Sequence, residues 1–148
     1  MAENKSYQTV RAYGEAEFTE KRSRFIGYAK PVQTEEQALA FLEEIRAKRW
    51  DARHNVYAYR LREGGLMRYS DAGEPQGTAG MPTLEALTKA DITDVALVTT
   101  RYFGGILLGT GGLVRAYAKA AQMALQAAGV VTMQMCLKAR LLCEYRCV

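Results

Sequence analysis

Polar and apolar residues are mixed along residues 18–32 in the manner of half-buried β-strands, with a charged turn at 20–23 and Pro31 at the end. Residues 55–61 alternate between polar and apolar more strictly. Gly64 and Gly65 follow as a turn, and residues 66–70 fit a returning strand. The pattern predicts two strand–turn–strand units, one on each side of a helical segment.

Helical spacing is found in three segments. In residues 34–49, four apolar side chains recur on one helical face, and Thr34 and Gln37 fit a capping box. A shorter helix is expected over residues 81–89, with Pro82 in its first turn. Residues 112–128 are apolar around most of the helix and stop at Gly129, so we expect this third helix to be nearly buried. Its polar residues fall on a single stripe: Arg115, Lys119, Gln122 and Gln126.

The apolar run 95–98 suits a strand buried on both faces, and residues 130–135 and 136–145 are expected to be extended. The predicted order is strands, helix, strands, helix, strand, helix, strand. This order favours an α+β fold: a two-layer sandwich of one mostly antiparallel sheet with helices on one face.

Composition narrows the class of protein. The 148 residues, 49% hydrophobic and 24% charged, suit one folded domain. No apolar run is long enough to span a membrane and the first residues do not resemble a signal peptide, so we expect a cytoplasmic protein. The cysteines, Cys136, Cys143 and Cys147, cluster far from the single histidine, His54, so we expect neither a disulfide framework nor a metal site, and no cofactor.

Residues 101–117 read R-Y-F-G-G-I-L-L-G-T-G-G-L-V-R-A-Y and hold five glycines within nine positions. A strand, a glycine loop and a helix start together form a potential anion site, because free N–H groups meet there at the positive end of the helix dipole. The nucleotide motifs fail, since Thr110 stands where a P-loop requires lysine and the G-x-G-x-x-G spacing is absent. The alternative is that the glycines serve tight strand–helix packing.

Charge distribution supports the anion interpretation. Residues 95–143 contain five basic residues and no acidic one, within a chain of net charge +4. Such a segment attracts phosphate-bearing partners, unless acidic residues elsewhere in the fold neutralise it. The predicted ligand- or anion-binding residues are Arg101, Gly104, Gly105, Gly109, Gly111, Gly112 and Arg115.

A second glycine-rich segment, residues 70–80, carries Asp71 and Glu74. Either these carboxylates face a ligand, a metal or the basic glycine loop, or they serve turn formation and solvation. With His54 they form a possible groove, although a lone histidine is more often structural. No serine or cysteine nucleophile has a visible partner, so the sequence leans away from an enzyme. Aromatic residues near Arg53, Arg68 and Arg101 could stack on bases: Tyr57, Tyr59, Tyr69, Tyr102 and Phe103.

Three motifs together resemble the IMPACT/YigZ family: D-A-R-H (51–54), S-D-A-G-E-P-Q-G-T-A-G-M-P (70–82) and the glycine segment 101–117. The resemblance extends from about residue 18 to about residue 129. Ala72 stands where many members carry aspartate, which argues against an acid or metal role for that loop. The family's fold is also seen in a ribosomal small-subunit protein and in domain four of the translocation elongation factor.

The resemblance implies an N-terminal domain over residues 1–135 and, over 136–148, the start of a truncated ferredoxin-like domain. The bacterial members have no established enzymatic activity, and the eukaryotic relatives regulate translation. It therefore implies a translation-associated regulatory protein with RNA or the ribosome as partner, through the basic glycine-rich loop. A protein partner in translation control is a further possibility. The alternative is a small-molecule or phosphate-binding enzyme that uses the groove between residues 70–80 and 101–115.

Overall fold

The structure, a computed structural model, describes residues 6–134, and its centre is a five-stranded sheet in the order β2-β3-β6-β4-β5. Every pair of neighbouring strands in this sheet is antiparallel. The strands are β2 (Gly14–Glu20), β3 (Ser23–Pro31), β4 (His54–Arg60), β5 (Met67–Ser70) and β6 (Val95–Tyr102). A separate antiparallel ribbon pairs β1 (Ser6–Val10) with β7 (Val130–Gln134). The expected α+β fold with a mostly antiparallel sheet is confirmed.

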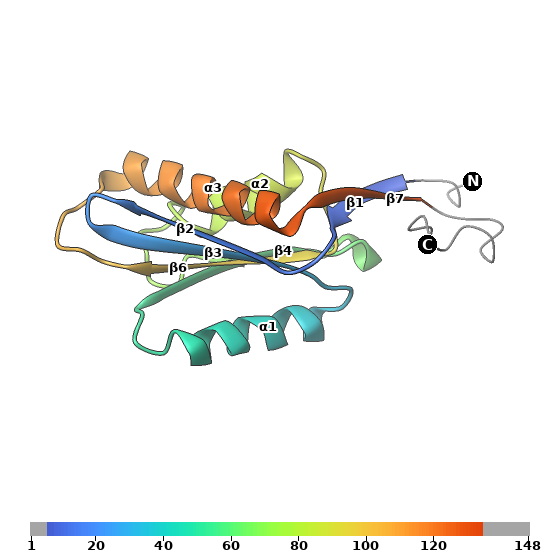
Figure 1. Cartoon of the computed structure of the whole chain (residues 1–148), viewed down its shortest axis with the longest axis horizontal. Coiled ribbons are helices and arrows are strands. Elements are labelled where there is room, and N and C mark those ends of the chain that lie inside the picture. Colours follow the sequence, from blue (N-terminus) through green and yellow to red (C-terminus); the bar gives the residue numbers. More distant parts are fainter. Residues whose placement is uncertain (1–5, 135–148) are drawn as a thin grey trace.

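The helices cover both faces of the sheet, not one (Figure 1). Helix α1 (Glu35–Lys48) lies against one face, while α2 (Gly80–Thr88) and α3 (Gly109–Ala128) lie against the other. The expectation of helices on one face is therefore wrong. The reason lies in β6, where Ala96 and Val98 pack in the cluster of α1, and Val95 and Leu97 pack in the cluster of α2 and α3. A strand that is apolar on both faces needs cover on both.

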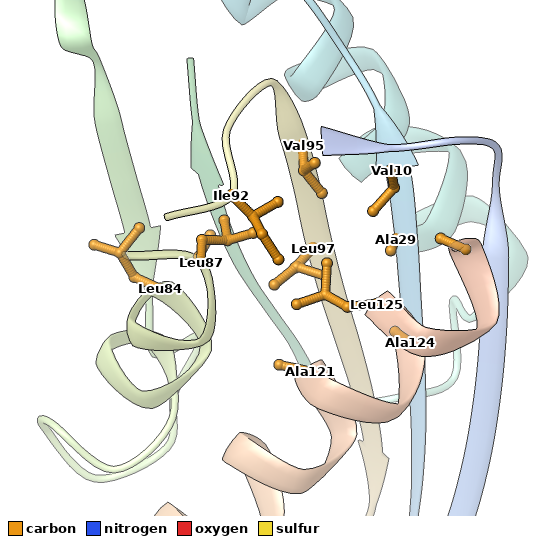
Figure 2. Close-up of a cluster of buried hydrophobic side chains, with 12 residues drawn as sticks. Val10, Ala29, Leu84, Leu87, Ile92, Val95, Leu97, Ala121, Ala124 and Leu125 are labelled. Atoms are coloured by element: carbon orange, nitrogen blue, oxygen red, sulfur yellow. The ribbon is translucent and has the colours of Figure 1, made fainter. Parts of the chain in front are cut away.

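The larger helical face packs closely on the sheet. Leu87 of α2 and Leu125 of α3 meet Leu97 of β6 in one buried cluster (Figure 2). Close approach of the alanine-rich α3 depends on Gly27, because a Cβ there would lie 2.6 Å from the carbonyl oxygen of Ala120. Glycine and alanine thus let this helix lie directly on β3.

Most local predictions are confirmed, with adjusted bounds. The Thr34 side chain accepts from the Gln37 N–H at 3.2 Å and caps α1. Strand β6 continues four residues beyond the predicted end. Helix α3 begins at Gly109, three residues before the predicted start, and is not nearly buried: its predicted polar stripe is on the solvent side. The sequence did not indicate β1, and the expected strand 136–145 and the three cysteines lie outside the described residues.

Four connections gather at one end of the sheet, which we call the loop end. They are the β2–β3 turn (21–22), the α1–β4 connection (49–53), the β5–α2 loop (71–79) and the β6–α3 loop (103–108). Strand register places them together, because His54 at the start of β4 pairs with Arg101 near the end of β6. Figure 1 shows the β2–β3 turn and the β6–α3 loop at this end, opposite the β1–β7 ribbon. All predicted site residues lie at or near the loop end.

Candidate functional site

Arg101 lies in a buried ion pair with Glu74. Its Nε donates to Glu74 Oε2 at 2.5 Å, its Nη2 donates to Oε1 at 2.8 Å, and its Nη1 donates to the Ser23 hydroxyl at 3.1 Å. The Tyr117 hydroxyl of α3 also donates to Glu74 Oε2. The two side chains are only 9% and 1% exposed. Since the pair is bidentate and buried, the Arg101 charge is neutralised inside the protein and is not offered to an outside phosphate.

The ionised state of Glu74 is maintained by its neighbours. Burial by itself raises the pKa of this carboxyl, but the hydrogen bonds from Arg101 and Tyr117 outweigh burial, so the pKa is lowered overall. Burial and the nearby Glu74 charge raise the pKa of the Tyr117 hydroxyl, which stays protonated as a donor. The arrangement links the β5–α2 loop, β6 and α3 through one carboxylate.

Asp71 serves turn formation. Its carboxylate accepts the backbone N–H groups of Gly77, Ala79 and Gly80 at 3.0, 3.1 and 2.7 Å. These contacts close the β5–α2 loop at the start of α2. Of the two interpretations of residues 70–80, turn chemistry therefore holds for Asp71, whereas Glu74 faces the basic residue Arg101.

His54 links β4 to the same loop. Its Nδ1 lies 2.9 Å from the carbonyl oxygen of Ala72, and because a carbonyl can only accept, Nδ1 carries the proton. Its Nε2 lies 3.9 Å from Glu74 Oε1. The structure thus brings His54, Glu74 and Arg101 together, in an arrangement that ties loops to the sheet.

The ion pair also bears on the alternative groove between residues 70–80 and 101–115. Glu74 comes from the first loop and Arg101 from the strand that leads into the second. Because they touch directly, these two side chains satisfy each other and are not available to a ligand. The arrangement supports a structural role for this region more than a small-molecule site.

An excess of positive charge lies on the other side of the β6–α3 loop, in what we call the basic pocket. This pocket of about 140 Å³ is lined by Lys21 of the β2–β3 turn and by Arg115 and Lys119 of α3. Lys119 Nζ lies 4.4 Å from the centre of the Phe18 ring. Within residues 6–134, the Lys21 and Arg115 side chains form no hydrogen bond or ion pair. Glu20 is the one acidic residue in the lining.

The start of α3 adds to this field. Leu108 occupies the N-cap position, no side chain caps the helix, and its first turn has no acidic residue. The N–H groups of that turn therefore keep the positive end of the dipole uncompensated. Gly112 lines the basic pocket, and Gly111 lies in the same turn.

Gly104 holds the loop against the β2–β3 turn. A Cβ at Gly104 would lie 1.9 Å from the Arg22 carbonyl oxygen, so only glycine allows this approach. The neighbouring Gly105 and the first residue of α3, Gly109, have φ of +94° and +79°, which favour glycine. Gly104 therefore serves close packing, whereas anion binding at Gly111 and Gly112 stays a prediction.

Of the basic pocket, sequence reasoning named Arg115 and Gly112 but did not include Lys21 or Lys119 in the site. The polar stripe of α3 already placed Lys119 one turn after Arg115. Lys21 comes from a distant hairpin, and no local pattern indicates its position.

Two further properties concern the described part of the chain. Between residues 6 and 134, no three His, Cys, Asp or Glu side chains are grouped closely enough to hold a metal ion. No helix in that range is both long and apolar enough to cross a membrane.

Comparison with known proteins identifies the family. Residues 21–125 match the family described as Impact N-terminal domain, and this chain belongs to the IMPACT family. It is 46% identical over 127 residues to the IMPACT family member YvyE of Bacillus subtilis. That match covers 85% of this chain but 58% of YvyE, so the chain spans little more than half the length of this relative.

Solved structures agree on the fold. A crystal structure of a hypothetical protein superposes with a TM-score of 0.81 at 37% identity, covering 88% of this chain and 65% of the other. The structure of Yih1, described as a two-domain translational regulator, superposes with a TM-score of 0.50 at 25% identity, covering 79% of this chain and 47% of Yih1. The resemblance to the IMPACT/YigZ family is thus confirmed.

Proposed function

We propose that this protein is a translation-associated regulator that binds RNA or the ribosome through the basic surface beside its glycine-rich loop. The observation that carries the proposal is the basic pocket, where Lys21, Arg115 and Lys119 meet beside the uncapped start of α3. Its relative Yih1 is described as a translational regulator, which supports the same setting for this chain. A cytoplasmic location and the absence of a cofactor belong to the proposal.

The pocket suits phosphate contacts for two physical reasons. Its cations come from two separate elements, the β2–β3 turn and α3, which converge on one pocket. Two of them have no internal partner in the described chain, so binding a phosphate breaks no existing ion pair. Arg101, which the sequence placed first among the binding residues, contributes indirectly by fixing the loop.

A protein partner in translation control would use the same exposed surface. An RNA-binding assay separates binding of such a partner from binding of RNA. RNA binding is measured by fluorescence anisotropy of a labelled oligonucleotide at several salt concentrations. We expect affinity to fall steeply as salt rises, because each phosphate contact releases condensed counterions. The absence of binding at low salt, or binding that does not respond to salt, would overturn the RNA proposal.

A further inference from the structure

A group of exposed aromatic, apolar and basic side chains lies beside the basic pocket at the loop end. It consists of Trp50 and Arg53 of the α1–β4 connection and Phe103 and Leu107 of the β6–α3 loop, and we call it the aromatic surface. Trp50 is 82% exposed, Phe103 52% and Leu107 80%. Large apolar side chains at this exposure are costly to leave in water, so this surface is a candidate for binding.

The Phe103 ring packs against the buried Arg101 side chain. The Arg101 guanidinium lies over the ring, 5.5 Å from its centre, and Arg101 is itself fixed by Glu74. Phe103 nevertheless remains 52% exposed, so part of the ring is accessible to a partner. A fixed aromatic plane can stack on a flat partner with little loss of side-chain freedom.

Arg53 connects the two aromatic residues. It lines a groove of about 480 Å³ together with Phe103 and Leu107, and it also lines the depression that contains Trp50. Within the described chain, the Arg53 side chain has no hydrogen bond or ion pair. Asp51, in the same groove, accepts from the Tyr102 hydroxyl at 2.8 Å. Arg53 therefore offers a cation without an internal partner that borders both the groove of Phe103 and the depression of Trp50.

The aromatic surface and the basic pocket both adjoin the β6–α3 loop. Leu107 lines the groove of the aromatic surface, and the next residue, Leu108, lines the basic pocket. A ligand with a charged backbone and flat side groups could occupy both at once. Single-stranded nucleic acid has this composition, and its recognition combines cationic grooves with aromatic stacking.

We propose that the aromatic surface binds single-stranded RNA, with bases stacked on Phe103 and Trp50 and a phosphate held by Arg53. The inference rests on the proposed function and narrows it, because a duplex keeps its base faces hidden and could reach only the cations. The charges favour RNA over an apolar protein partner, since Arg53, which has no ion pair within the described chain, borders the depressions of both aromatic residues.

The test uses the single tryptophan of the chain. Because Trp50 is exposed, its intrinsic fluorescence reports on stacking without a label. A single-stranded RNA dodecamer should quench this fluorescence on binding, and a duplex of the same length should leave it unchanged. Phe103→Leu removes the ring and keeps an apolar side chain, and we expect it to lower affinity for the single strand about tenfold while duplex affinity stays the same. Phe103→Tyr keeps the ring and should bind like the parent protein.

Three results would overturn the inference. If RNA binds without quenching Trp50, or if Phe103→Leu binds the single strand as the parent does, stacking is excluded while the proposed function stands. If the duplex binds more tightly than the single strand, the narrowing to single strands is wrong. If neither RNA binds, the proposed function falls together with this inference, and the surface belongs to a protein partner. A thermal melt of each variant establishes that it is folded.

Discussion

Arg101 and Glu74 form a bidentate ion pair that joins the end of β6 to the β5–α2 loop and is covered by Tyr117 of α3. The pair explains why the most prominent cation of the glycine segment is not a surface charge. It fixes the loop whose two sides carry the basic pocket and the aromatic surface. Arg101 therefore supports the binding surface without contributing its own charge to it.

Glu74→Gln should destabilise the protein by about 3 kcal/mol, because it leaves the buried Arg101 charge without its counterion. Glu17→Gln is the matched control, since it removes the carboxylate of the exposed Arg24–Glu17 pair, and it should cost less than about 1 kcal/mol. Urea denaturation of both variants measures the difference. An equal decrease in the free energy of unfolding in the two variants would show that the buried Arg101–Glu74 pair stabilises the protein no more than the exposed pair does.

We also expect the loss of stability in Glu74→Gln to depend on pH. The folded protein holds the pKa of Glu74 below its ordinary value of 4.5, so the unfolded chain binds a proton first as pH falls. This contribution to stability is complete above that value and is lost as pH decreases through the lowered pKa. The stability difference between the parent and Glu74→Gln should therefore narrow below pH 4.5. Urea titrations across this range test it, and a constant difference would contradict the sign.

Much of the fold follows from local signals. Thr34 and Gln37 indicate the start of α1, and the alternation of residues 55–61 indicates a strand. Strand β1 was not predicted, and its partner β7 comes from the other end of the described chain. The apolar run 95–98 indicates that both faces of the sheet are covered. Which face α1 covers depends on how the chain connects α1 to the sheet, and local residue patterns do not indicate this.

The site was predicted only in part for a similar reason. The glycine segment and the start of α3 are marked by residue type, and both lie at the loop end. The Arg101 side chain is buried because it pairs with Glu74, which is 27 residues away in the sequence. Lys21 joins the basic pocket through the packing of the β2–β3 turn against Gly104, which no spacing rule indicates.

Two glycine substitutions test that packing. Gly104→Ala places a Cβ 1.9 Å from the Arg22 carbonyl oxygen, so the turn carrying Lys21 must move, and we expect lower stability and weaker RNA binding. Gly111→Ala meets only the end of the flexible Arg115 side chain and lies in a helix, so it should be neutral or stabilise by about 0.5–1 kcal/mol. Thermal melts and binding assays of both variants provide the comparison. Equal Tm values and equal RNA affinities of the two variants would contradict a packing role for Gly104.

Phosphorylated small molecules should not stabilise the protein. The Arg101 and Glu74 side chains are buried against each other, so neither is available to a ligand between the two loops. A ligand at a hundredfold excess over its Kd would raise the free energy of unfolding by about 2.7 kcal/mol. A thermal-shift series with nucleotides and sugar phosphates should stay flat. A concentration-dependent rise in Tm that persists when Arg115 and Lys119 are both replaced by alanine would favour the enzyme alternative.

The central claim is that the basic pocket contacts RNA phosphates, and the salt dependence of binding tests it most directly. Removing two contacts to a single strand with Arg115→Ala and Lys119→Ala together should reduce the slope of log K against log salt by about 1.4. Lys89→Ala is the matched control, because Lys89 is exposed and within residues 6–134 pairs only with Glu85 of the preceding helix, and it should keep the parental slope. A double variant with the parental slope and affinity would contradict the claim.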